Sequence, residues 1–205
     1  MLRSFCGGIL AVTLLAGAAA TSAAQETGTP IFKAPYRAFT THELGASFSD
    51  PGSGVSFALE GFYRYGHGPY DLSVRGGWLD LNGSAGHRVL LGADARTTIL
   101  TYSESFPLDG ALTLGFGAQL GDGPDSYLIP IGISLGRRFN LEGSNTTFVP
   151  YVHPVLVPVF GGGDSNVDAA LGLGVDVRFS EDLALRVSGG IGDIEGVGIS
   201  LAYIR

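Results

Sequence analysis

The sequence predicts an all-β protein: a single antiparallel transmembrane β-barrel, with ten strands preferred and eight as the alternative. Apolar and polar residues alternate in segments of about ten residues, the length that a transmembrane strand needs. Clusters of Gly, Asp, Asn and Pro separate these segments. The chain of 205 residues contains 33 Gly, and 15% of its residues are charged, whereas soluble domains average about 25%.

The composition also argues against several protein classes. A hydrophobic content of 45% is too high for a disordered chain. The formal net charge is −7 and there is no basic run, so nucleic acid is not an expected partner. Long helices would need more Ala, Glu, Lys and Arg than this glycine-rich chain has.

Residues 1–24 have the layout of a secretory signal peptide. Arg3 gives a positive start, an apolar stretch follows from Gly7 to Ala20, and small residues end at Ala24. We therefore expect export and cleavage after Ala24. The single cysteine, Cys6, would leave with the signal, so the exported chain would lack disulfides.

The rest of the chain divides into an irregular opening and a barrel. The opening, 25–38, contains two prolines and is expected to be a periplasmic segment; 39–205 is expected to be the barrel. The predicted strands are 39–50, 53–65, 69–81, 87–101, 110–121, 127–139, 147–160, 167–179, 183–192 and 196–205.

The alternation gives each strand one large apolar face and one small or charged face. In the fifth segment, Leu112, Leu114 and Phe116 share one face, and Thr113 and Gly115 share the other. In a transmembrane barrel the apolar face meets lipid, whereas in a soluble ligand-binding barrel it forms the core. The scarcity of lysine and the glycine on the polar face favour the membrane barrel, and the soluble periplasmic barrel stays an alternative.

Aromatic residues add support for a membrane barrel. If both chain ends lie in the periplasm, six aromatics on the apolar face gather near the periplasmic end, where an interfacial girdle is expected. They are Tyr63, Tyr65, Tyr70, Phe139, Phe179 and Tyr203.

The signal peptide, the alternating strands and the closing segment from Gly196 to Tyr203 resemble the small bacterial outer-membrane β-barrel family, the OmpA/OmpX-like group. The resemblance implies residence in the cell outer membrane, contact with its lipid and lipopolysaccharide, and insertion by the outer-membrane assembly machinery. Members usually end on an aromatic residue, whereas this chain ends with Ile204 and Arg205. No peptidoglycan-binding domain is expected after the barrel.

Charged residues on the polar face predict an ion-paired lumen. Turn positions determine which side chains face each other across a hairpin. The expected pairs are Glu60 with Arg75, Arg64 with Asp71 and Asp176 with Arg186. Extending the first pair across the neighbouring turns gives a row that runs Glu43, Glu60, Arg75, Asp94. The whole network comprises Glu43, Glu60, Arg64, Asp71, Arg75, Asp94, Arg96, Asp176 and Arg186. Such pairs are expected to hold a narrow barrel together rather than to catalyse a reaction.

The seventh segment contains Pro150, Pro154 and Pro158 at positions of one parity. Their missing N–H groups all face one neighbouring strand, so one seam should be short of hydrogen bonds. Two interpretations stay open, a strained strand without access and a lateral opening for a lipid. Outer-membrane acyltransferases of the PagP type are similar in having prolines at such gaps.

No catalytic, cofactor or metal motif is identifiable in the sequence. We therefore expect a non-enzymatic envelope protein, structural or permeable to small solutes through a narrow lumen. The alternative from another class is a lipid-handling barrel, a transporter or an acyl-modifying enzyme, that uses the proline strand 147–160.

Overall fold

The computed structural model describes residues 26–205 apart from residues 53 and 84. The predicted signal peptide therefore lies outside the described residues. Those residues form β-strands joined by turns, and none of them belongs to a helix long and apolar enough to cross a membrane.

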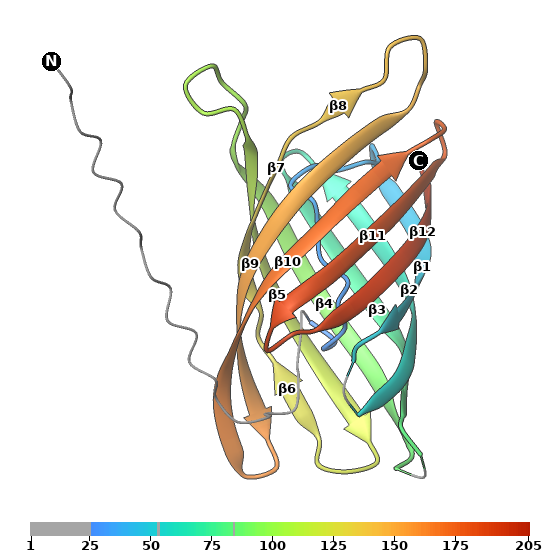
Figure 1. Cartoon of the computed structure of the whole chain (residues 1–205), viewed down its shortest axis with the longest axis vertical. Helices are drawn as coiled ribbons and strands as arrows, with labels where there is room; N and C mark the ends of the chain where they lie inside the picture. The colour runs from blue at the N-terminus through green and yellow to red at the C-terminus, as the bar shows by residue number, and fades with distance from the viewer. Residues whose placement is uncertain (1–25, 53, 84) are drawn as a thin grey trace, which may run out of the picture.

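The strands form one antiparallel sheet that closes into a barrel, because the first strand pairs with the last (Figure 1). The strands are β1 (His42–Asp50), β2 (Val55–His67), β3 (Tyr70–Leu81), β4 (His87–Leu100), β5 (Asp109–Gly121), β6 (Ser126–Leu128), β7 (Ile131–Gly136), β8 (Phe139–Asn140), β9 (Thr147–Gly161), β10 (Asp164–Arg178), β11 (Leu183–Gly192) and β12 (Gly196–Ile204).

β6, β7 and β8 are three pieces of one barrel strand. All three pair with β9, and β6 and β7 also pair with β5. Pro130 interrupts the strand between β6 and β7, because proline cannot donate to a neighbouring strand. The predicted ten-stranded antiparallel barrel is therefore confirmed.

Side chains on the two faces of the wall differ sharply. The outer face carries large apolar residues such as Leu44, 62% exposed, and Leu59, 52% exposed. Charged residues such as Glu43 and Glu60 on the same strands point inward and are 1% and 2% exposed. A soluble ligand-binding barrel would need the opposite arrangement, with its apolar face inside.

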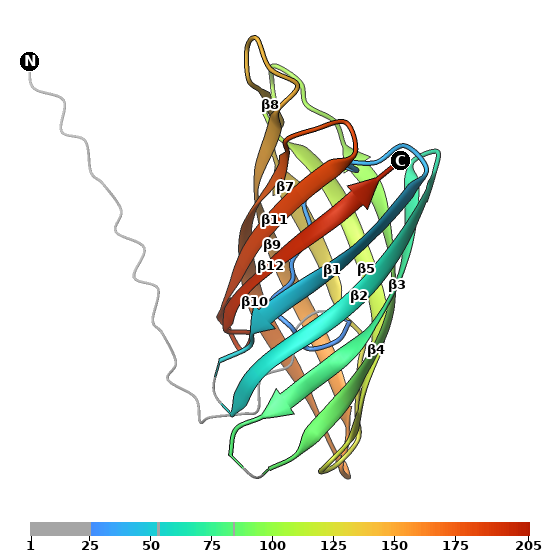
Figure 2. The same cartoon turned by 90° about the vertical axis from the view of Figure 1, so that its right-hand side faces the viewer.

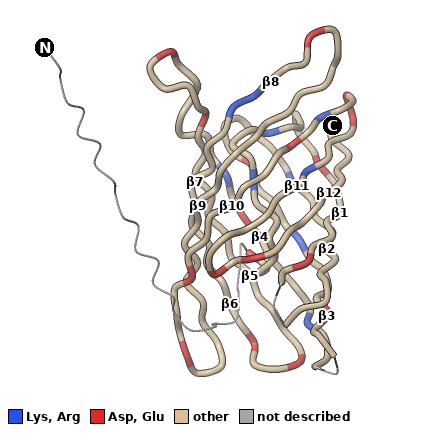
Figure 3. Tube along the Cα trace, viewed as in Figure 1, with Lys and Arg blue, Asp and Glu red and all other residues tan. Residues whose placement is uncertain are grey.

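The start of the first strand and the end of the last strand meet at one end of the barrel. β1 begins beside the end of β12, where Glu43 pairs with Ile204 (Figure 2). The turns at both ends carry acidic residues, and basic residues also lie along the wall between them (Figure 3).

Candidate functional site

The candidate functional site is the barrel interior, which the N-terminal segment 26–41 enters and fills. This segment, which we call the plug, crosses the lumen before β1 begins (Figure 1). Residues 26–35 are all buried. In the described part of the expected N-terminal segment, 26–38, polar groups bind the inner wall of the barrel.

Glycines on the inner wall make room for the plug. A Cβ on Gly117 would lie 1.1 Å from the backbone O of Glu26, and a Cβ on Gly172 would lie 2.1 Å from the ring of Phe32. Heavy atoms cannot approach so closely, so any side chain at these positions would displace the plug. The glycine-rich face is the surface on which the plug packs.

The only lysine of the chain holds the plug to the wall. Nζ of Lys33 lies 2.6 Å from Oε1 of Glu26 and 2.6 Å from Oδ1 of Asp94 on β4. Burial raises the pKa of Glu26, the charge of Asp94 adds to the rise, and Lys33 opposes it. If Glu26 keeps its proton, Lys33 and Asp94 form an ion pair with no net charge, which suits a site shielded from water.

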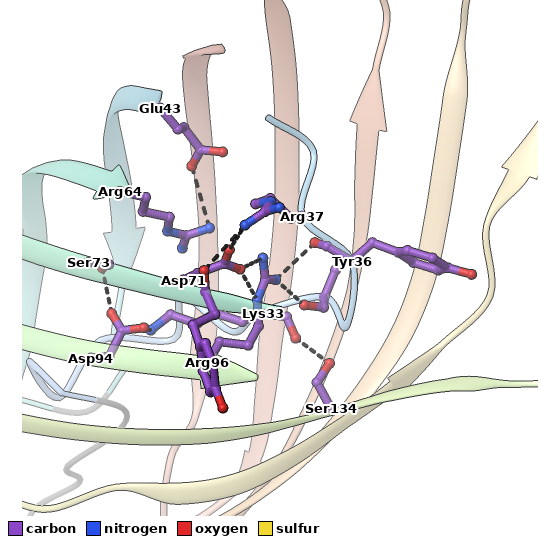
Figure 4. A network of polar contacts seen from close by, with 12 residues as sticks. Lys33, Tyr36, Arg37, Glu43, Arg64, Asp71, Ser73, Asp94, Arg96 and Ser134 are labelled. Atoms are coloured by element: carbon purple, nitrogen blue, oxygen red, sulfur yellow. Dashed lines mark hydrogen bonds and ion pairs between the residues drawn. The ribbon is translucent and has the colours of Figure 1, made fainter. Parts of the chain in front are cut away.

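Arg96 joins the plug to β3 and β4. It donates to the backbone O of Tyr36 at 2.9 Å and to the carboxylate of Asp71, which also accepts from Arg37 at 3.0 Å (Figure 4). The hydroxyl of Tyr36 donates to Asp109. Burial and this hydrogen bond raise the pKa of Tyr36 to about 12.

A second network crosses the lumen around Arg186 on β11. Its guanidinium lies 2.6 Å from Oε2 of Glu43 and 2.9 Å from Oδ2 of Asp176. Arg64 reaches Oε1 of Glu43 at 3.4 Å. The ring of Phe62 lies beneath Arg64 and near Arg186, with guanidinium-to-centroid distances of 5.2 and 5.9 Å. These contacts join β1, β2, β10 and β11 across the barrel.

Three hairpins pair in a register that differs from the prediction. Glu60 lies opposite Ser47 and Gly77 instead of opposite Glu43 and Arg75. Arg75 nevertheless reaches Glu60 diagonally, at 3.7 Å between Nη1 and Oε2. The long arginine side chain spans the offset.

The shift also changes the other predicted partners. Arg64 lies opposite Glu43, and the expected contact with Asp71 is wrong because Asp71 pairs with Arg96. Asp94 lies opposite Ser73 instead of Arg75. The register between β10 and β11 is as predicted, with Asp176 opposite Arg186.

The structure places the sequence-predicted residues in three sets. All nine network residues are at most 9% exposed, and each takes part in an ion pair. The six aromatics predicted to form a girdle are exposed: Tyr63, Tyr65, Tyr70, Phe139, Phe179 and Tyr203. Pro150, Pro154 and Pro158 lie on the outer face of β9.

The prolines weaken the seam between β9 and the strand formed by β6 to β8. The backbone O of Pro158 accepts from the N–H of Ile129, and that of Pro150 accepts from the N–H of Arg137. Neither proline has an N–H with which to donate a second hydrogen bond across the seam. Along the described length of β7 and β9, the pairing is interrupted. Gly132 pairs with Val155 and Leu135 pairs with Val152, but the residues between these two pairs are not paired. The central proline, Pro154, occupies this gap.

Apolar side chains are buried toward the end of the lumen that lies away from the start of β1. Leu90, Leu128, Val157 and Ile194 are each 0% exposed. Leu128, Val157 and Ile194 form one buried cluster with Phe32 of the plug, so these side chains fill this part of the interior. At the opposite end, a hollow of about 250 Å³ lies between the plug and β9 to β11.

Sequence reasoning missed the plug residues Glu26, Lys33 and Tyr36, and their partners His153 and Ser134. The usable signal was the inner glycine face, because a lumen lined by glycine needs another group to fill it. His153 accepts from the backbone N–H of Lys33 at 3.3 Å, and its Nε2 lies 2.9 Å from Thr113 Oγ1.

Among the described residues, no group of three or more His, Cys, Asp and Glu side chains is arranged to hold a metal ion. Comparison with known protein families finds no matching family model, and comparison with curated proteins finds no match.

Proposed function

We propose that this protein is a non-enzymatic outer-membrane β-barrel that its own N-terminal plug keeps closed. The arrangement of the two wall faces carries the proposal. Exposed apolar side chains such as Val187, Ile199 and Leu201, which are 45–52% exposed, would be costly in water, at about 25 cal/mol per Å² of apolar area. In a bilayer they would contact lipid chains.

The orientation follows from the chain ends. A signal peptide at 1–24 and a first and last strand that meet at one end support a periplasmic position for that end. The exposed aromatics Tyr63, Tyr70 and Tyr203 fit a girdle near that interface. Outer-membrane lipid, lipopolysaccharide and the assembly machinery are the partners that this location supplies.

The lumen contacts favour a structural role over catalysis. The buried carboxylates of Glu43, Glu60, Asp71, Asp94 and Asp176 all pair with cationic side chains. Paired charges on facing strands stabilise a barrel, whereas a catalytic acid or base needs access to substrate. Solute permeation would require the plug to leave.

Gel mobility of the protein from the outer-membrane fraction, boiled against unboiled, tests the proposal. A closed membrane barrel should resist SDS until it is heated, and the wild-type protein should then show little conductance in planar bilayers. Recovery in the soluble periplasmic extract with no mobility shift would reject the proposal.

The gap at Pro154 favours one second candidate, a barrel that admits a lipid between β7 and β9. Replacing Pro150, Pro154 and Pro158 together with Val separates the candidates. A scaffold should resist heating better, because each new N–H can form a hydrogen bond of about 1 kcal/mol. A lipid-handling barrel should lose its activity on lipid.

A further inference from the structure

Two consecutive arginines lie on opposite faces of the wall between β7 and β8. Arg138 contacts the plug, with its guanidinium 4.2 Å from the centroid of the Tyr36 ring. Arg137 lies on the outer face, with its guanidinium 4.9 Å from the centroid of Tyr102 and 5.3 Å from that of Phe139. Arg137 is exposed and forms no ion pair with any described residue.

An apolar groove of about 580 Å³ is lined by Gly136, the residue that precedes this outer arginine in the chain. The backbone N–H of Arg137 donates to Pro150, which lines the groove, at 3.3 Å. From there the groove continues over the outer face of β9, β10 and β11, past Val152, Leu173 and Val187.

We propose that this surface binds one membrane phospholipid, with its phosphate on Arg137 and one acyl chain in the groove. The proposal rests on the proposed function, because it requires the outer face to lie in lipid. A guanidinium offers paired donors that match phosphate oxygens. The rings of Tyr102 and Phe139 fix its position without neutralising its charge.

A lipid fits better than a free anion. Arg137 is one exposed cation, and one exposed ion pair contributes little binding energy in water. The adjoining groove adds the burial of a hydrocarbon chain, so a ligand that has both a phosphate and a chain gains from both contacts.

The test compares lipids that differ only in the headgroup, bound to the folded full-length protein. Native mass spectrometry of the protein in detergent would measure retention of phosphatidylglycerol and of diacylglycerol with the same chains. Arg137→Gln removes the charge, and Arg138→Gln makes the same change one residue along, on the inner face. Val152→Phe fills the groove and keeps Arg137.

The wild-type protein and Arg138→Gln should retain phosphatidylglycerol at least about tenfold better than diacylglycerol, the effect of one charge-assisted hydrogen bond. Arg137→Gln should abolish this preference, and Val152→Phe should weaken the binding of both lipids. Equal retention of phosphatidylglycerol by Arg137→Gln and the wild-type protein would overturn the proposal. Displacement of the bound phosphatidylglycerol by millimolar inorganic phosphate would also overturn it, because the site would then bind a free anion. Each variant must first show the heat-dependent mobility shift; its absence in the wild type would reject the membrane barrel itself, which is a separate failure.

Discussion

The backbone N–H of Lys33 donates to Nδ1 of His153 at 3.3 Å, and this bond connects the plug to the middle of β9. The backbone O of Lys33 accepts from the hydroxyl of Ser134 on β7. In the register of the two strands, Ser134 stands opposite His153, inside the gap that Pro154 occupies. One plug residue therefore bridges two strands whose own hydrogen bonding is interrupted.

This bridge predicts that Ser134→Ala loosens the seam. The variant loses one buried hydrogen bond of about 1 kcal/mol, so amide hydrogen exchange in β7 and β9 should quicken about fivefold. Ser47→Ala is a matched control, because Ser47 is also buried and its hydroxyl has no hydrogen-bond partner among the described residues. Unchanged exchange in Ser134→Ala would show that the plug does not support the seam.

The glycine contacts predict that Gly117→Ala displaces the plug. The added Cβ would overlap the backbone O of Glu26, which no rotamer change can relieve. Planar bilayers should then show conductance that the wild-type protein lacks. Gly76→Ala is the control, since a Cβ there would meet its nearest neighbours at an ordinary 3.6 Å. A silent Gly117→Ala barrel that still folds would mean that the lumen stays closed without the docked plug.

The sequence could predict which face each charge occupies but not its partner. Glu60 faces Gly77 instead of Arg75 because the turn centres on Gly68 and Pro69, one position later than expected. An error of one position in a turn shifts the pairing by two residues, and strands have a period of two. The inward assignment of Glu60 and Arg75 therefore survives a wrong register.

The plug could not be predicted from local pattern. Residues 26–38 contain Pro30 and Pro35 and have no strand or helix period, because their partners come from the wall and not from their own neighbours. Lys33, for example, contacts residues on β4, β7 and β9. Such contacts depend on the closed barrel, which exists only after distant strands have paired.

The diagonal contact between Glu60 and Arg75 predicts rescue by a charge swap. Glu60→Arg alone should destabilise the barrel by about 3–5 kcal/mol, because it leaves like charges buried together. Adding Arg75→Glu should restore most of the loss, but not all, since Thr29 Oγ1 donates to Oε2 of Glu60 at 2.8 Å. The temperature at which the unboiled gel band shifts measures each variant. Equal losses in the single and double variants would contradict a direct ion pair.

The raised pKa of Glu26 predicts a pH dependence of plug docking. Because the docked plug holds this proton more tightly than the free segment, docking gains stability that is complete below the free pKa of 4.5. That stability is lost as pH rises through the raised pKa. Glu26 faces Asp94, Lys33 and Arg75, so its ionisation places a second carboxylate beside Asp94. As the pH is raised above 4.5, protease cleavage of the plug should increase in the wild-type protein. Glu26→Gln imitates the protonated acid and should keep cleavage low and constant over this range; parallel pH profiles for the two proteins would assign the dependence to another group.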